Sequence, residues 1–246
     1  MEFDPKFKNM QQTIIYKTIP RPNPALIEML KGIPVADLHD EMNAIDRRTR
    51  LMSPKMRPLF PCNPFVGPAV TAYNTPGDNL MMHTALFYAQ RGDVLIITNG
   101  GFVDGALCGS NAAMQAIKIG VAAMVIDGPA RDSAQIKELG FGVWSTSITA
   151  SKPGKEAPGM VNTPIYCAGV RVNPGDIVVG DQDSVIVIDP GDVERLVAAA
   201  KARIHRDEMM HVAISKGSTL FQEIGCGERL QSIGAVIKEG HWKVTD

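Results

Sequence analysis

The chain has 246 residues, a formal net charge of −1 and a pI near 6.5. Its hydrophobic fraction of 45% and charged fraction of 21% are ordinary for a folded protein with a core, and they exclude a largely disordered or collagen-like chain. The near-zero charge disfavours a protein that binds nucleic acid through a basic surplus. At roughly 150 residues per domain, one large domain is possible.

The expected compartment follows from three absences in the sequence. No apolar run reaches the roughly 18 residues that span a bilayer, and residues 1–9 lack the apolar stretch of a secretory signal. The four cysteines form no Cys-x-x-Cys pair, so we expect neither a cysteine-based zinc site nor a disulfide framework. These features predict a cytoplasmic protein without a membrane partner.

The N-terminal segment, residues 1–32, is expected to be an extended arm followed by a short helix. Pro20, Pro22 and Pro24 lie in a polar context, and such an arm often packs on a neighbouring subunit, although a loose terminus has the same composition. Pro24–Leu30 is expected to be that short helix, and a second helix is expected from near Val35. The Pro- and Met-rich stretch 48–68 predicts irregular structure.

The middle of the chain alternates short apolar runs with segments of helical periodicity. The expected elements are, in order, strand 67–73, helix 80–90, strand 94–98, helix 111–119, strand 122–127, helix 133–139 and a strand from 143. Strand–helix–strand units of this length imply parallel strands joined by right-handed crossovers. We therefore expect an α/β domain.

The last third of the chain predicts a different order of elements, with several short strands followed by helices. Short strands expected at 165–168, 177–180 and 185–188 are separated by turns too short to hold helices, so they should form a β-rich layer. Long helical periodicity follows from Asp192 to about Lys216, and a last helix from Thr219 could continue towards residue 233. The expected organisation is the arm and short helix, the α/β domain over 33–190 and C-terminal helices over 191–246.

Ligands of open α/β sheets bind at the carboxyl ends of parallel strands. Three loops at such ends, 75–79, 99–111 and 128–132, are rich in Gly, Asp or Asn and should converge if their strands are neighbours. The loop at 99–111 has neither the dinucleotide spacing nor the lysine of a P-loop. Unpaired N–H groups at the start of the following helix could bind a carboxylate or phosphate, although such a loop is more often only a turn.

Arg131 and Asp132 lie side by side after an expected buried strand. An arginine can bind a carboxylate through two hydrogen bonds, and an aspartate suits Mg²⁺, which takes one or two carboxylates and keeps several waters. The pair could therefore hold a 2-oxo acid together with a metal. A salt-bridged pair that caps a helix explains the dipeptide equally well.

Other catalytic chemistry is weakly indicated. The five histidines form no HxxxH or HxH pair, and His83 is interpreted as a core or interface residue of its helix. No GxSxG motif occurs, and nothing in the sequence pairs Cys108 with a base.

Several ordered motifs extend over most of the chain. They are PGDN at 76–79 followed by His83, RGDVL at 91–95, 120–128 leading to Arg131 and Asp132, GFGVWS at 140–145, CAGVRV at 167–172 and PGDIVV at 174–179 leading to Asp181 and Asp183. Together, from about Ile33 to Leu230, they resemble the RraA-like family. That family includes the class II aldolases for 4-hydroxy-4-methyl-2-oxoglutarate and 4-carboxy-4-hydroxy-2-oxoadipate.

The resemblance implies a fold, an assembly and a set of site residues. The fold is of the swivelling β/β/α type, in a homotrimer or a pair of trimers with sites between subunits. The implied cofactor is Mg²⁺ or Mn²⁺, and the implied product is pyruvate. Arg131 would bind the substrate carboxylate and Asp132 the metal. Backbone N–H groups that bind pyruvate would come from Gly109, Ser110, Asn111 and Ala112.

This sequence departs from the aldolase pattern at the loop. The aldolases usually carry an acidic residue directly after the loop glycine, and Ser110 stands there. A neutral serine is a poor substitute for a carboxylate that handles protons. Another family carboxylate comes from the C-terminal helix of a neighbouring subunit. Its candidates here are Glu208, which we prefer, and Asp207, although a solvated helix face explains both. The implied catalytic residues are thus Arg131, Asp132 and Glu208.

Three functions remain open at this point. The leading hypothesis is a metal-dependent lyase that cleaves a 2-oxo acid to pyruvate, by retro-aldol cleavage or by decarboxylation of oxaloacetate. A diverged relative could act on another small acid. A non-catalytic RraA-like protein could instead regulate a ribonuclease by protein–protein contact. Retention of Arg131 and Asp132 favours the enzyme.

Overall fold

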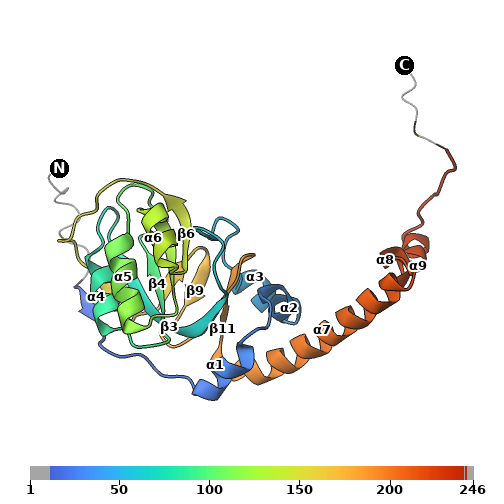
Figure 1. Cartoon of the computed structure of the whole chain (residues 1–246), viewed down its shortest axis with the longest axis horizontal. Coiled ribbons are helices and arrows are strands. Elements are labelled where there is room, and N and C mark those ends of the chain that lie inside the picture. Colours follow the sequence, from blue (N-terminus) through green and yellow to red (C-terminus); the bar gives the residue numbers. More distant parts are fainter. Residues whose placement is uncertain (1–11, 241, 243–246) are drawn as a thin grey trace. The chain divides into compact units, whose positions relative to one another are not determined.

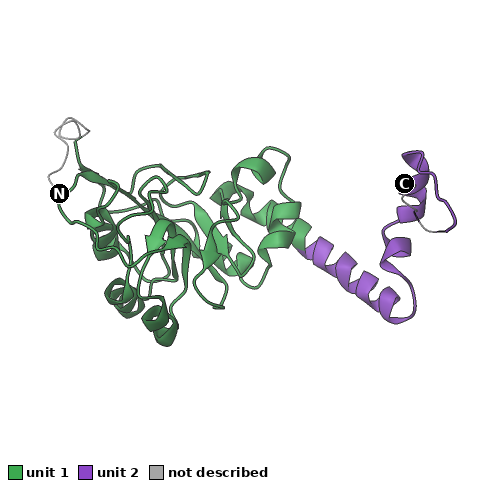
Figure 2. Cartoon of the chain, turned by 90° about the horizontal axis from the view of Figure 1, so that it is seen from above, with its two compact units in different colours: residues 1–200 green, residues 201–246 purple. Residues whose placement is uncertain are grey.

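The computed structural model describes residues 12–240 and 242. The chain divides into two compact units, residues 1–200 and 201–246 (Figure 2). In the first unit, seven strands lie in the order β1-β7-β3-β4-β5-β6-β2, and β10 and β11 join this sheet through β3. β8 (Ile165–Cys167) and β9 (Val170–Val172) form a separate hairpin.

The centre of the sheet consists of parallel strands joined by helices. The strands are β3 (Phe65–Asn74), β4 (Val94–Thr98), β5 (Ala123–Ala130) and β6 (Val143–Ile148), and each pairs in parallel with the next. The connecting helices are α4 (Leu80–Tyr88), α5 (Ser110–Ile119) and α6 (Ser133–Leu139), which lie together on one side of the sheet (Figure 1). The predicted parallel α/β arrangement is confirmed.

Both faces of the central sheet are buried, which explains why its strands are continuous apolar runs. In β4 all five residues are buried. Leu95 and Ile97 pack into the core beneath the helices, whereas Val94 and Ile96 pack into a second core on the opposite face. This alternation follows from the two-residue period of a strand.

The second core lies under the β-rich layer that the sequence predicts. β10 (Ile177–Gly180) and β11 (Val185–Ile188) form an antiparallel hairpin, and β10 pairs with the first residues of β3. The fully buried Trp144 packs edge-on against Phe65, and its ring N–H donates to the carbonyl oxygen of Asp181 at 2.9 Å. The molecule therefore has a helix layer, a central sheet and a β layer.

The described part of the N-terminal arm is attached to its own chain. β1 (Ile14–Ile15) pairs in parallel with β7 (Gly159–Val161), a short strand that the sequence analysis did not foresee. Arg21 forms an ion pair with the fully buried carboxylate of Asp93, and Nη2 lies 3.1 Å from Oδ2. These internal contacts argue against a loose terminus for the described part of the arm, and its packing on a neighbouring subunit stays a prediction. Residues 1–11 lie outside the described residues.

The segments on either side of the central sheet hold more structure than expected. α1 (Pro24–Leu30) and α2 (Val35–Asp40) begin where the sequence predicts them. The stretch expected to be irregular contains α3 (Asp46–Thr49) and β2 (Arg57–Pro58). β2 pairs with β6, so it is formed by a tertiary contact that local sequence does not encode.

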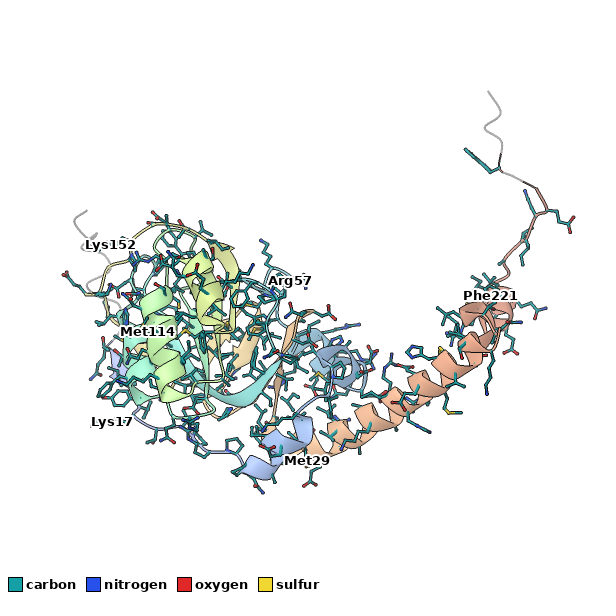
Figure 3. All side chains as sticks on the ribbon, viewed as in Figure 1. Lys17, Met29, Arg57, Met114, Lys152 and Phe221 are labelled. Carbon is teal, nitrogen blue, oxygen red and sulfur yellow. The ribbon has the colours of Figure 1, made fainter. Side chains whose placement is uncertain are left out.

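The C-terminal helices begin with a short 3₁₀ turn, Pro190–Asp192, followed by α7 (Val193–Ser215). α8 (Leu220–Glu223) and α9 (Cys226–Ser232) are separate helices, because Gly225 between them adopts a left-handed conformation with φ of 65°. In the second unit large apolar side chains such as Met209 and Phe221 are exposed (Figure 3). Within the described residues, no helix is both long and apolar enough to cross a membrane.

Candidate functional site

The three loops singled out in the sequence meet at one cavity of about 120 Å³. Asn79 and His83 reach it from the start of α4, and Gly109 from the loop before α5. Arg131 and Asp132 reach it from the end of β5. A fourth segment, around Lys155, also lines the cavity and was not singled out by sequence.

Arg131 and Asp132 are positioned by pairing between the end of β5 and the loop before α5. The N–H of Leu107 donates to the carbonyl oxygen of Pro129 at 2.8 Å, and the N–H of Arg131 donates to that of Cys108 at 2.9 Å. Asp132 then adopts a left-handed conformation with φ of 59°, which aspartate tolerates better than most residues. The loop is therefore attached to the strand that carries the candidate site.

The carboxylate of Asp132 caps α5. Its Oδ2 accepts hydrogen bonds from the N–H and from Oγ of Ser110, each at 3.1 Å. Although Asp132 directly precedes α6, its side chain makes no capping hydrogen bond to that helix. The alternative interpretation, a salt-bridged pair that caps a helix, therefore agrees with these contacts, and the capped helix is α5.

Position 109 requires glycine because the side chains of Asp132 and Arg131 lie close to its Cα, and its backbone conformation does not require one. Its φ of −145° is open to any residue, but a Cβ added there would lie 2.7 Å from Asp132 Oδ2 and 3.2 Å from Arg131 Nε. Absence of a side chain lets Arg131 and Asp132 lie against the start of α5. Arg131 Nε is 3.8 Å from Asp132 Oδ2, and both side chains remain about one third exposed, at 38% and 34%.

The backbone donors that the family resemblance implies are only partly free. The N–H of Ser110 donates to Asp132, and that of Ala112 donates to the carbonyl oxygen of Gly109 at 3.1 Å. Among the described residues, nothing accepts from the N–H groups of Gly109 and Asn111. These two are the donors left for an anion at the positive end of α5.

The oxygen atoms of this cavity suit a hard cation with a water shell. Nothing in the described ranges donates to Asp132 Oδ1, and Asn79, only 5% exposed, has a side-chain oxygen without a hydrogen-bond partner there. Over the same ranges no three His, Cys, Asp or Glu residues gather as metal ligands. One carboxylate with neutral oxygens fits Mg²⁺ or Mn²⁺, whereas zinc takes three or four protein ligands.

His83 lies in the cavity wall, so it is not a core residue, whereas its interpretation as an interface residue stays a prediction. It is half-buried, and it follows Met82, which is fully buried, on α4. Burial lowers the pKa of His83, the positive charge of Lys155 lowers it further, and Asp78 acts in the opposite direction. The imidazolium form of His83 is therefore disfavoured.

Asp78 holds the segment that carries Lys155. Its side chain is buried, and Oδ2 accepts hydrogen bonds from the N–H groups of Glu156 at 2.7 Å and Ala157 at 3.1 Å. Oδ1 accepts from the N–H of Leu80 at 2.8 Å. The carboxylate thus connects the start of α4 to the chain around residue 155. These contacts span 78 and 79 residues, so no local pattern could have shown them.

Two other candidate residues have simpler environments. Cys108 is buried, and burial raises the pKa of its thiol to about 12, with the charge of Asp132 adding to the effect. A thiol of that pKa is a poor nucleophile, in agreement with the sequence argument. Glu208 belongs to the second unit, where it is exposed and Oε2 lies 3.6 Å from His205 Nδ1. Its catalytic role stays a prediction.

The fold and cavity define an α/β protein with a β layer and a small cavity lined by Arg131, Asp132 and Lys155. The chain belongs to the RraA-like family, whose model, described as Aldolase/RraA, matches residues 35–187. A Halalkalibacterium halodurans protein provisionally named 4-hydroxy-4-methyl-2-oxoglutarate aldolase is 36% identical over 189 residues, 77% of this chain and 88% of the relative. A Burkholderia mallei protein of the same provisional name is 33% identical over 160 residues, 65% and 96% of the two chains.

Solved structures of the same fold carry a different functional description. A Streptomyces coelicolor protein, an unusual member of the RNase ES inhibitor RraA family, superposes with a TM-score of 0.70 at 25% identity and covers 78% of this chain and 98% of its own. The RNA-processing inhibitor RraA from Thermus thermophilis superposes with a TM-score of 0.56 at 27% identity, covering 63% and 92%. Fold alone therefore does not separate aldolase from inhibitor.

The neighbouring positions of His83 and Lys155 can be tested without any ligand. We expect the His83 imidazole, assigned with a His83→Gln variant, to titrate in NMR spectra below the ordinary value of 6.5. Lys155→Ala should move that midpoint upward, because a nearby positive charge disfavours the imidazolium ion. Lys152→Ala, at an exposed lysine three positions earlier, is the control. An unshifted midpoint in Lys155→Ala would contradict the described geometry.

Proposed function

We propose that this protein is a divalent-metal-dependent lyase that cleaves a C–C bond of a 2-oxo acid and releases pyruvate. The substrates we propose are 4-hydroxy-4-methyl-2-oxoglutarate, by retro-aldol cleavage, and oxaloacetate, by decarboxylation. The observation that carries the proposal is the position of Arg131 and Asp132 beside the start of α5 in one cavity. The provisional aldolase names of relatives that cover most of the chain support it.

The proposed substrate binds through its C1 carboxylate. The guanidinium group of Arg131 forms two hydrogen bonds with that carboxylate, and the free N–H groups of Gly109 and Asn111 add donors at the positive end of α5. Asp132 and the oxygen of Asn79 are the groups that would hold Mg²⁺ or Mn²⁺. Such a cation, when bound, supplies positive charge at the 2-oxo oxygen.

The two proposed reactions differ in the proton transfers that the protein has to support. In the retro-aldol reaction the 4-hydroxyl proton is removed, the C3–C4 bond breaks with its electron pair going to C3, and C3 then takes up a proton. In decarboxylation CO₂ leaves and only C3 has to be protonated. The Ser110 hydroxyl donates to Asp132 and carries no charge, so it is a weak base for the hydroxyl proton. Glu208 of a neighbouring subunit is the base we propose.

The two alternatives make different demands on the cavity. An RraA-like inhibitor works by protein–protein contact and needs no arginine and aspartate at the wall of a small cavity, so the cavity favours an enzyme. A relative that acts on another small acid would keep Arg131 and Asp132 and differ at Ser110 and Asn111. Such a protein would release no pyruvate from either proposed substrate.

Pyruvate release is the direct test of the proposed lyase. We expect Mg²⁺ to support turnover of oxaloacetate, a chelator to abolish it, and Asp132→Asn to lose the Mg²⁺ response. Asparagine tolerates the left-handed conformation of position 132, so this variant should fold. Arg131→Ala should abolish turnover because the carboxylate loses its anchor. Turnover of Asp132→Asn with an unchanged dependence on Mg²⁺ would contradict the assignment.

Ser110→Asp tests whether the missing loop carboxylate limits the aldolase reaction. We expect wild-type retro-aldol turnover to be weak and oxaloacetate decarboxylation to be better preserved. Restoring an acid should raise the aldolase rate, up to the roughly 10²–10⁴-fold that a positioned acid or base contributes. Ser110→Asn, which adds bulk without charge, is the control. Fast wild-type aldolase turnover that Ser110→Asp does not increase would show that another residue, first of all Glu208, transfers the proton.

A trimer-based assembly is also part of the proposal. Taken by itself, the second unit exposes Met209, Phe221 and Ile237, which is more apolar surface than an isolated pair of short helices normally leaves in water. We expect these side chains to be covered by a second copy, and sedimentation at micromolar concentration to show a homotrimer or homohexamer. A monomer under those conditions would contradict the assembly and the use of a neighbour's Glu208.

A further inference from the structure

The cavity carries a second cationic side chain, Lys155, in addition to Arg131. Arg131 follows β5, whereas Lys155 precedes β7, and the order of strands across the sheet is β7-β3-β4-β5. Neighbouring strands lie about 4.8 Å apart, so β7 and β5, three spacings apart, are separated by roughly 14 Å. The two cationic side chains therefore reach the cavity from different parts of the sheet edge.

Lys155 is presented by a backbone that is held in place. Gly154 accepts a hydrogen bond from the N–H of Asn79 at 3.1 Å and donates to the carbonyl oxygen of Gly77 at 2.8 Å. On the other side of Lys155, the N–H groups of Glu156 and Ala157 donate to the buried carboxylate of Asp78. Both neighbours of Lys155 are thus fastened to the start of α4, which restricts where its side chain can reach.

The charge of Lys155 is not used inside the part of the chain that the structure describes. Neither an ion pair nor a hydrogen bond to its ammonium group occurs among those residues. Arg131 and Lys155 together exceed the charge of Asp132 by one unit before any cation binds. A substrate with one carboxylate would occupy Arg131 and leave Lys155 without a partner.

We propose that Lys155, with His83 beside it, binds the second carboxylate of a dicarboxylic 2-oxo acid. The ammonium group supplies the charge, and the imidazole supplies an N–H donor. This inference rests on the proposed function for the first subsite, at Arg131. It makes Lys155 a specificity residue that separates dicarboxylic from monocarboxylic 2-oxo acids and takes no part in bond cleavage.

The test compares two ligands that differ only at the distal end. 2-Oxoglutarate has the carbon chain of the proposed aldol substrate, and 2-oxopentanoate has a methyl group in place of its second carboxylate. Neither is a substrate of the proposed reactions, so affinity can be measured by calorimetry on the full-length protein in Mg²⁺ buffer. We expect wild-type protein to bind 2-oxoglutarate about tenfold more tightly, as for a charged hydrogen bond at a partly exposed site.

Three variants make the test specific. Lys155→Ala should remove the preference for 2-oxoglutarate and leave the affinity for 2-oxopentanoate within about twofold of wild type. Lys155→Arg should retain most of the preference, because it keeps the charge. Lys152→Ala should behave as wild type, because Lys152 (labelled in Figure 3), although exposed like Lys155, does not line the cavity.

The outcomes separate this inference from the proposed function. A wild-type protein that binds neither ligand, shows no preference, or keeps its preference in Lys155→Ala overturns the role of Lys155, even if pyruvate is released in the lyase assay. A preference that depends on Lys155 in a protein that releases no pyruvate upholds the distal subsite and refutes the lyase. The same preference should weaken as salt is added, because the contact is electrostatic.

Discussion

The candidate site depends on the contact between the Asp132 carboxylate and the start of α5. Oδ2 accepts hydrogen bonds from the N–H and the hydroxyl group of Ser110, so the end of β5 and the first turn of α5 hold each other in place. The contact needs a glycine at position 109, since any side chain there would collide with Asp132 and Arg131. This contact occupies Oδ2 of Asp132, whereas Oδ1 accepts from no donor in the described chain. Oδ1 is therefore the atom that would be available to a cation.

Two aspartates at this edge of the sheet have different tasks because their surroundings differ. Asp78 is 2% exposed, and its oxygens accept three backbone N–H groups, so it is a structural residue that connects α4 to the segment around Lys155. Asp132 is about one third exposed and accepts from a single residue. A buried carboxylate that already accepts three of the roughly four hydrogen bonds open to it has little capacity left for a metal. Hydrogen-bond accounting therefore favours Asp132 over Asp78 as the residue that we propose for the cation.

Much of the fold could be predicted from sequence because its central strands are buried on both faces and read as uninterrupted apolar runs, as in Val94–Thr98. The pair Arg131 and Asp132 could be found because both residues follow such a run. β7 has three residues and takes its place from pairing with β1 and β3, so it carries no local signal. Lys155 was missed for a similar reason, since its position depends on Asp78, 77 residues earlier in the sequence.

Members of this family share the backbone but carry different functional descriptions, so function must reside in a few side chains around the cavity. Ser110 shows how small the difference is. An acidic residue there would face Asp132 across about 3 Å, the distance of the present hydroxyl contact, and two carboxylates so close favour a cation between them. Serine instead donates to Asp132 and removes that repulsion. We therefore expect the cavity of this chain to depend less on a cation for its stability, and to bind one more weakly, than a relative with an acidic residue at this position.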